Sequence, residues 1–393
     1  MSSVSLNGIT SRQLVSLRRE LWDWSICDDC ENKRDCSTPT CAIQLQTQLS
    51  CYFKYCHRLV NSYRQHDRNG DRPALSTFED LLALIRALKE NPALKRIELT
   101  NKVFKDAHGG TGGATISTVE LERALNLAAK IVTMTSCTSL GQSLLLLEHG
   151  LIRIPWRADS SLCEFITRTF PSSDSQNPSA EMIVSSIEHS ILARKLKKVA
   201  GLRLIPTDDL SSHLKMSRQH RTLQIFHHCG FLKENLRKTE DLGSLSVEEC
   251  LKLGCIPRQL ALETLYTIQR ILFPLHEAKS YSLLSSLISS ASFDPECLEI
   301  PSVLHRGPEE GEFRYYYFGS RLEELYEEVS EPGPQNRLGK WIDKRKGTRH
   351  VMLATLTGVV IAIVLGILTL GVSGYQAWIG YQQWQHPKST SDN

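Results

Sequence analysis

Four cysteines near the N-terminus have the types and spacing of a metal site. Cys27, Cys30, Cys36 and Cys41 follow one another as C-x2-C-x5-C-x4-C. Four thiolates at about 2.3 Å can close a tetrahedral zinc site, and the dipole of a predicted helix would ease Cys41 towards the thiolate form. The spacing is close to that of a zinc knuckle, although the second pair lacks the usual CxxC turn.

Two other interpretations of these cysteines stay open. The chain has twelve cysteines, of which six fall in the first 60 residues. The cytosol keeps thiols reduced, so a disulfide framework is the weakest interpretation and unliganded thiols are the ordinary one. We therefore expect no cofactor by default, and a structural zinc is the metal that the sequence allows.

A second group of chemistry-bearing residues lies past the middle of the chain. His227, His228 and Cys229 follow a strand-like run, Thr222–Phe226, and an acidic pair stands upstream at 208–209. A catalytic Cys–His pair needs its side chains in contact, whereas neighbours on a strand point to opposite faces. We expect packed or hydrogen-bonded histidines and assign no catalytic residue.

The most apolar stretch of the chain is 351–372. These 22 residues carry no charge, and about 20 apolar residues cross a hydrocarbon core roughly 30 Å thick. In lipid a single helix satisfies its own backbone hydrogen bonds. Because the segment has no polar face, a buried core helix is the weaker alternative, and we predict a transmembrane helix.

The residues on either side of this span predict its orientation. Only Asp343 opposes the basic residues that precede the span, which are Arg337, Lys340, Lys344, Arg345, Lys346 and Arg349. After the span only Lys388 is basic, so the N-terminal region should be cytosolic. The first 20 residues lack the apolar region of a signal peptide. The pattern predicts a tail anchor in an endomembrane or the plasma membrane.

A stripe of small residues runs along the predicted span. Ala354, Gly358, Ala362 and Gly366 recur at every fourth position. Small residues let two membrane helices approach closely, so the stripe predicts a homodimer through the span. The alternative is the general tolerance of membrane helices for small residues.

An aromatic group follows the span. Tyr375, Trp378, Tyr381 and Trp384 recur at three-residue spacing. Amphipathic rings prefer the headgroup region, so we predict an interfacial belt on the far leaflet. The alternative is packing against a partner protein.

Helix signals dominate the residues before the span. Four Ser-x-x-Glu pairs have the pattern of a capping box, namely Ser76/Glu79, Ser117/Glu120, Ser161/Glu164 and Ser246/Glu249. Strand signals are limited to 151–156, 202–205 and Thr222–Phe226. The predicted fold class is mainly α, a helical cytosolic region with a few short strands, plus one C-terminal transmembrane helix.

Composition and linkers suggest seven segments. They are a Cys-rich helical segment (1–66), a helical region (67–170), a linker (171–180), a helical domain (181–330), a basic juxtamembrane linker (331–350), the transmembrane helix (351–372), and an aromatic belt with a short tail (373–393). The formal net charge of the chain is +3, and the basic juxtamembrane residues alone carry more positive charge than this. The rest of the chain is therefore near neutral and lacks the basic surface that is typical of nucleic-acid binding.

Five motifs in the C-terminal half are distinctive: IPTDDL (205–210), IFHHCGFLKE (225–234), PRQLALE (257–263), YYFGSRLEELY (316–326) and YQAWIGYQQWQHP (375–387). In these motifs the chain resembles a group of uncharacterised single-span membrane proteins of filamentous fungi. The resemblance implies a single-span protein of unknown function, brings no catalytic residues, and does not include the cysteine cluster.

These observations predict a tail-anchored protein of unknown biochemical activity. We expect a non-enzymatic scaffold or interaction protein, whose partners are the lipid bilayer, a second copy of the chain and unidentified proteins, but no nucleic acid. Two alternatives remain: a membrane-tethered enzyme with an unrecognised helical fold, and a membrane-perturbing effector. The effector would need a second mobile amphipathic segment, which the sequence does not suggest.

Overall fold

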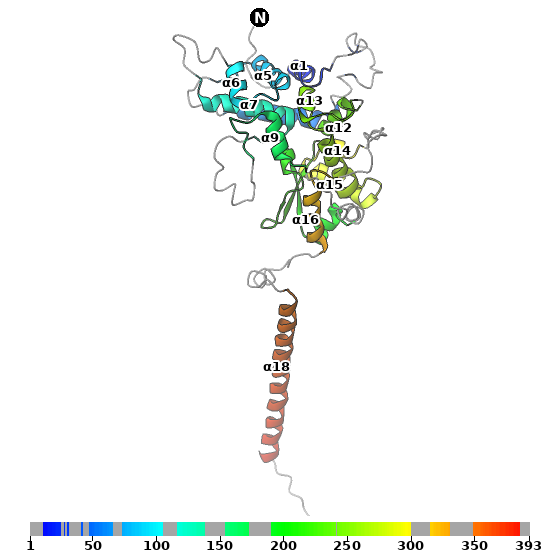
Figure 1. Cartoon of the computed structure of the whole chain (residues 1–393). Helices are drawn as coiled ribbons and strands as arrows, with labels where there is room; N and C mark the ends of the chain where they lie inside the picture. The colour runs from blue at the N-terminus through cyan, green and yellow to red at the C-terminus, as the bar shows by residue number, and fades with distance from the viewer. Residues whose placement is uncertain are drawn as a thin grey trace, which may run out of the picture. The chain divides into compact units, whose positions relative to one another are not determined.

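The computed structural model divides the chain into two compact units, Met1–Pro332 and Gly333–Asn393 (Figure 1). The described residues are 11–24, 27, 30, 41, 47–65, 73–104, 116–137, 154–172, 190–240, 242–299, 315–330 and 349–385. Helices dominate both units, with a small three-stranded sheet in the first and a long apolar helix in the second. The predicted fold class is therefore confirmed.

The N-terminal part of the first unit is built from helices. They are α1 (Ser11–Trp22), α4 (Ser50–Gln65), α5 (Phe78–Glu90), α6 (Arg96–Val103), α7 (Thr118–Thr133) and α9 (Leu162–Thr169). α5 packs against α1 and α7, and α7 packs against α4. These contacts bury the apolar stripe of α5, which recurs at helical spacing and consists of Phe78, Leu81, Leu82, Leu84, Ile85 and Leu88.

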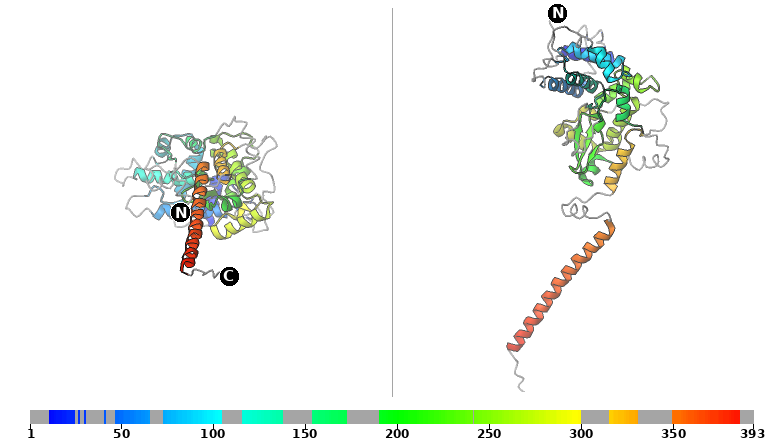
Figure 2. Two further views of the ribbon diagram at one scale, coloured as in Figure 1. Left: turned by 90° about the horizontal axis from the view of Figure 1, so that it is seen from below. Right: turned by 60° about the vertical axis from the view of Figure 1, so that its left-hand side comes forward.

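The C-terminal part of the first unit mixes helices with the sheet. Its helices are α11 (Ala193–Lys198), α12 (Cys229–Lys238), α13 (Val247–Lys252), α14 (Arg258–Tyr266), α15 (Ala278–Ala291) and α16 (Gly319–Ser330). Shorter turns are η3 (Leu210–Ser212), the π-helical η4 (Thr267–Leu272) and η5 (Pro295–Cys297). α12 packs on α14, and α13 contacts both α5 and α9. Figure 2 shows this arrangement from two further directions.

Side-chain caps set where several helices begin. The predicted capping boxes at Ser161 and Ser246 are present: each serine Oγ accepts the N–H of the glutamate three residues later, whose carboxylate accepts the serine N–H. At Ser117 only the first of these bonds forms. The carboxylate of Glu120 instead accepts a hydrogen bond from Tyr63 Oη.

The predicted box at Ser76 and Glu79 is wrong by one residue. α5 begins after Thr77, whose Oγ1 accepts the N–H of Asp80 at 3.2 Å, while Asp80 Oδ2 accepts the N–H of Thr77 at 2.7 Å. The same carboxylate oxygen accepts the N–H of Ser76 at 2.9 Å. One aspartate therefore satisfies two backbone donors, which favours this register.

The sheet has the strand order β1-β3-β2. β1 (Arg203–Thr207) pairs in parallel with β3 (Thr222–Phe226), and β2 (Met216–Ser217) pairs antiparallel with β3. The predicted strands at 202–205 and Thr222–Phe226 are thus found, whereas β2 was not predicted. The strand predicted at 151–156 is wrong for 154–156, which form no strand; 151–153 lie outside the described residues.

An aromatic cluster joins the two parts of the first unit into one core. Tyr52 of α4 stacks on Phe231 of α12, with ring centroids 5.2 Å apart, and Trp22 of α1 lies 5.5 Å from Tyr52. All three rings are buried. Aromatic contacts of this kind add to the burial of large apolar surfaces, so helices far apart in sequence fold as one body.

Candidate metal centres and apolar helix

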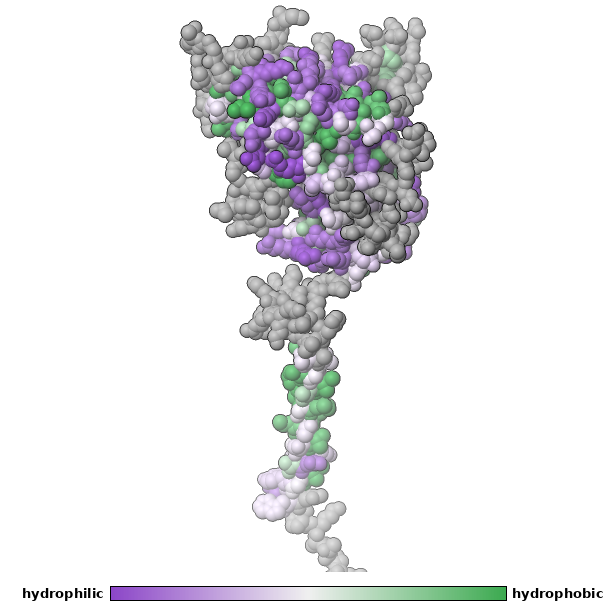
Figure 3. Space-filling view, viewed as in Figure 1, coloured by the Kyte–Doolittle hydropathy of each residue, from purple (hydrophilic) through white to green (hydrophobic). Residues whose placement is uncertain are grey.

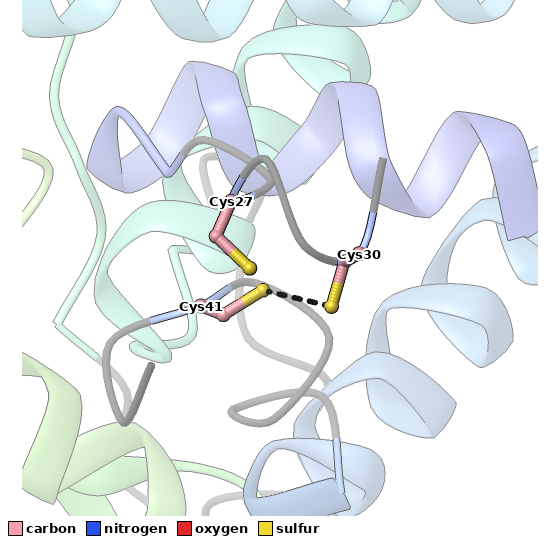
Figure 4. Close-up of side chains that lie close together, drawn as sticks. All are labelled: Cys27, Cys30 and Cys41. Atoms are coloured by element: carbon pink, nitrogen blue, oxygen red, sulfur yellow. Dashed lines mark hydrogen bonds between the residues drawn. The ribbon is translucent and has the colours of Figure 1, made fainter. Parts of the chain in front are cut away.

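Three of the four predicted metal ligands come together between α1 and α4. Figure 4 shows the thiols of Cys27, Cys30 and Cys41 pointing towards one another. Their Sγ atoms all lie within 4.8 Å of one another, and the Sγ atoms of Cys30 and Cys41 are 3.6 Å apart. Zinc with tetrahedral bonds of about 2.3 Å separates neighbouring sulfurs by about 3.8 Å. The three thiols therefore have a spacing that can hold a metal; Cys36 lies outside the described residues.

The end of α1 positions the first of these cysteines. Asp23 has a left-handed backbone (φ 55°), and its N–H donates to Arg19 O at 2.9 Å, which closes the helix. The next residue, Trp24, is buried, and its Nε1–H donates to Glu234 Oε1 of α12 at 2.6 Å. The chain is therefore fixed to α12 just before Cys27.

The cysteine cluster lies at the edge of the core. Cys41 is buried, whereas Cys27 and Cys30 are half-buried, and none of the described cysteines forms a disulfide. Charged groups need compensation when they are taken out of water. A cation shared by the three converging sulfurs would supply that compensation.

The second unit contains α18 (Arg349–Gln385), a helix of 37 residues. Within it, Thr355–Gln382 is long and apolar enough to cross a membrane, by length and composition, and none of this segment is buried. Figure 3 shows apolar side chains over much of its visible face. At about 1.5 Å per residue α18 is about 55 Å long, which exceeds a hydrocarbon core of roughly 30 Å. The predicted span and aromatic belt therefore lie on one uninterrupted helix.

The small residues of α18 have open space around them within the helix's own unit. A Cβ atom added at Gly358 or Gly366 would meet nothing within 4 Å, and Ala362 between them is exposed. Ala354 lies in the helix, but its side chain is not among those described. No contact within the second unit therefore requires glycine at these positions.

The aromatic residues occupy the last turns of α18. Tyr375, Trp378, Tyr381 and Trp384 are all more than half exposed, and the rings of Tyr375 and Trp378 stack with centroids 6.2 Å apart. Successive residues of an α-helix are about 100° apart, so a three-residue step turns by about 60° in the opposite sense. Four aromatics at this spacing cover about half of the circumference, which suits an interfacial belt better than one partner-facing stripe.

A second cluster of potential metal ligands lies where β1 and β3 end. Thr207 pairs with Phe226 in the parallel register, so Asp208 and the residues after β3 leave the sheet at the same edge. Asp208 Oδ1 lies 2.7 Å from His228 Nε2 and 3.4 Å from His227 Nε2. One carboxylate oxygen thus faces two imidazoles.

The neighbours of this cluster fix its protonation. Burial raises the pKa of Asp208, but hydrogen bonds from both histidines and the charge of Arg58 outweigh it, so the pKa lies well below its usual range. Burial lowers the pKa of His228 to about 4, against the bond to Asp208. His227 Nδ1 accepts the N–H of Asp294 at 3.1 Å. At neutral pH the aspartate is ionised and His228 is neutral.

The prediction of hydrogen-bonded histidines is confirmed, but the reasoning about opposite faces was wrong. β3 ends at Phe226, so His227 and His228 lie between the strand and α12 rather than on a strand. Their ring centroids are 4.2 Å apart. The sequence contained the IPTDDL and FHH motifs, but only the parallel pairing of β1 with β3 brings them together.

Comparison of the chain with protein-family models, with curated proteins and with solved structures finds no match in any of the three.

Proposed function

We propose that the chain is a tail-anchored membrane protein whose N-terminal unit is a non-enzymatic scaffold or interaction module in the cytosol. The observation that carries this proposal is α18, whose apolar segment Thr355–Gln382 is long and apolar enough to cross a membrane and carries its apolar side chains on the outside of the helix. Exposing an apolar surface of this kind to water is unfavourable in free energy. The bilayer of an endomembrane or of the plasma membrane would cover it.

The orientation rests on the basic residues that precede α18 in the sequence. Five of them lie outside the described residues, and Arg349 begins the helix. Positive residues are retained on the cytosolic side. In intact microsomes, added protease should digest the first unit and spare a fragment containing α18. Protection of the large N-terminal unit would contradict the proposed topology.

The chemistry of the buried thiols supports an interaction module rather than a nucleophilic enzyme. Burial raises the pKa of both Cys56 and Cys137 to about 12. The thiolate is the nucleophilic form of cysteine, so these thiols are inert at neutral pH. His213 is also buried, with Nε2 bonded to Thr267 Oγ1 and Nδ1 accepting the N–H of Phe226, so neither ring nitrogen is open to a substrate.

A structural zinc on Cys27, Cys30, Cys36 and Cys41 is part of this proposal. The close approach of three of the four thiols supports it, because a zinc ion would tie the connection between α1 and α4 to the core. Purified full-length protein in detergent should contain about one zinc per chain at this site. Cys30→Ser with Cys41→Ser should remove it, whereas Cys163→Ser, a half-buried thiol elsewhere, should not. Unchanged zinc in the double variant would refute the site.

The proposal also includes self-association of the chain through α18. The open space around Gly358 and Gly366 supports it, since close approach of a second helix would use that space. In this proposal the chain belongs with the single-span fungal proteins that its C-terminal half resembles, and unidentified proteins bind the first unit.

A membrane-tethered enzyme is the alternative function, and the cluster of Asp208, His227 and His228 favours it. Two imidazoles and a carboxylate also occur in catalytic metal sites that keep an open position. A metal-dependent activity of the full-length protein that is lost in Asp208→Asn would select the enzyme over the scaffold.

A further inference from the structure

The geometry of the second ligand cluster points to a metal site that is separate from the cysteines. We propose that Asp208, His227 and His228 bind a divalent transition-metal ion through Asp208 Oδ1 and the two Nε2 atoms. The three ligand atoms lie within 4.8 Å of one another. Bonds of about 2.1 Å in a tetrahedral centre separate neighbouring ligand atoms by about 3.4 Å. The observed separations of 2.7 and 3.4 Å from Oδ1 need only small side-chain movements to reach this value.

The donor set selects the class of metal. Imidazole nitrogens suit zinc, cobalt, iron and nickel, whereas calcium and magnesium prefer sites made of oxygen alone. Metal ligands must be deprotonated. The two Nε2 atoms and Asp208 Oδ1 already face one another, so a metal ion would replace the protons that lie between them.

The surroundings of Asp208 orient it for this role. Arg58 Nη2 of α4 donates to Asp208 Oδ2 at 2.8 Å, which holds the carboxylate and leaves Oδ1 facing the histidines. Hydrogen bonds of this kind to a ligand are a regular part of metal sites. The Asp208 side chain is 36% exposed, so an ion can enter from solvent and water can complete its coordination.

The positions of the ring protons determine the affinity. In the metal-free protein His227 Nδ1 accepts the N–H of Asp294, so Nε2 carries the proton. A metal on this Nε2 requires the proton to move to Nδ1, which breaks that bond. His228 Nδ1 is buried with no hydrogen-bond partner in the described structure, so the same shift breaks no bond at Nδ1, and the metal ion replaces the bond from Nε2 to Asp208. We expect the affinity of this centre to be at least about tenfold below that of the cysteine site.

Cobalt titration of the full-length protein in detergent tests this site. Thiolate ligation to cobalt gives an intense near-ultraviolet charge-transfer band, whereas nitrogen and oxygen ligands give only weak visible bands. After removal of bound metal, the wild-type chain should bind about two cobalt ions per chain. The Cys30→Ser/Cys41→Ser variant should lose the intense band and retain one ion with weak visible bands.

Asp208→Asn in this cysteine variant should then weaken the remaining binding by at least about tenfold. Asparagine keeps an oxygen that accepts from the imidazole N–H groups, so the helical circular dichroism should not change. Asp159→Asn, at an exposed aspartate paired with Arg157, is the matched control and should leave binding unchanged.

Two results would overturn the second site. One is a folded cysteine variant that binds no cobalt, and the other is equal cobalt binding with Asp208 and with asparagine. If Asp208→Asn unfolds the chain, the unfolding temperature of the cysteine variant is measured with and without zinc instead. A rise with zinc would support the second site, and no rise would reject it. Failure of the cysteine site appears separately, as absence of the charge-transfer band from the wild-type protein.

Discussion

Glycine residues distinguish the first unit from α18. A Cβ atom at Gly230 would lie 2.1 Å from the backbone oxygen of Gln48, and one at Gly254 would lie 2.2 Å from a backbone oxygen of α1. At Gly358 and Gly366 of α18 an added Cβ would meet nothing within 4 Å. The first unit therefore needs glycine at these two positions for contacts inside the chain. No contact inside the second unit requires glycine in α18.

Charge distinguishes the same two regions. The first unit buries acidic groups and satisfies them internally: Glu263 accepts backbone N–H groups from Tyr316, Tyr317 and Phe318. α18 has no Asp, Glu, Lys or Arg after Arg349. Polar contacts inside the first unit thus stabilise its structure. The contacts of α18 depend instead on what surrounds the helix. Substitutions in the first unit should therefore change the free energy of unfolding, whereas substitutions in α18 should change association with other helices.

The largest expected effect is that of Gly230→Ala in the first unit. The new methyl group collides with a backbone atom, so the start of α12 must move away from the turn before α4. We expect the free energy of unfolding to fall by about 4 kcal/mol or more. Urea denaturation of the full-length chain in detergent, followed by tryptophan fluorescence, measures this loss. Gly366→Ala should leave it unchanged, and equal losses would remove the distinction between the regions.

The next effect is the pH dependence that Glu263 gives to the first unit. Burial raises its pKa from 4.5 to about 7, against its hydrogen bonds. Between these two pH values the folded protein keeps a proton on Glu263 that the unfolded chain has already released. The free energy of unfolding is therefore highest below about pH 4.5 and falls as the pH rises to about 7. Relative to Glu263→Gln, the wild type should lose up to about 3 kcal/mol across this window.

Unfolding of both proteins at several pH values between these limits measures the difference. A constant difference in the free energy of unfolding would show that Glu263 does not titrate in this range. α18 has no carboxylate to titrate, so its helicity in vesicles should stay constant over the same window.

A smaller effect is expected in α18, where the readout is association rather than folding. Gly358→Ile with Gly366→Ile should weaken self-association of the full-length chain by about 1–2 kcal/mol, because branched side chains prevent close approach. Val360→Ile with Ile367→Leu, off the stripe, should have little effect. Energy transfer between labelled chains in vesicles separates the cases. No association of the parent chain, or equal loss from both pairs, rules out the dimer.

The smallest effect is the loss of a single helix cap. Ser161→Ala removes the hydroxyl that accepts the N–H of Glu164 at 3.1 Å at the start of α9. We expect about 1 kcal/mol of destabilisation. Ser289→Ala, at an exposed position inside α15, should change the free energy of unfolding by less than about 0.5 kcal/mol. Similar losses from both would mean that the cap contributes nothing specific.

Local patterns in the sequence predicted much of the fold. The bounds of β3, the caps at Ser161 and Ser246, and the apolar length of α18 all depend on residues close together in the chain. The approach of Cys27 and Cys30 to Cys41 was predictable for the same reason.

Contacts between distant segments could not be predicted in this way. The proximity of Asp208 to His228 depends on the parallel pairing of β1 with β3, which no local pattern reveals. The register of the α5 cap was also ambiguous, because Ser76 and Thr77 each precede an acidic residue by three positions. Only the geometry of Asp80 separates them.

The bond between Trp24 and Glu234 has a consequence for biosynthesis. Its two ends are 210 residues apart in the chain. A ribosome adds about 5–20 residues per second, so Trp24 waits about 10–40 s before its acceptor is made. During that interval the aromatic surface of α1 and α4 lacks Phe231 and must be shielded by chaperones or remain exposed. α18 is synthesised later still, so the first unit can close before the apolar helix leaves the ribosome.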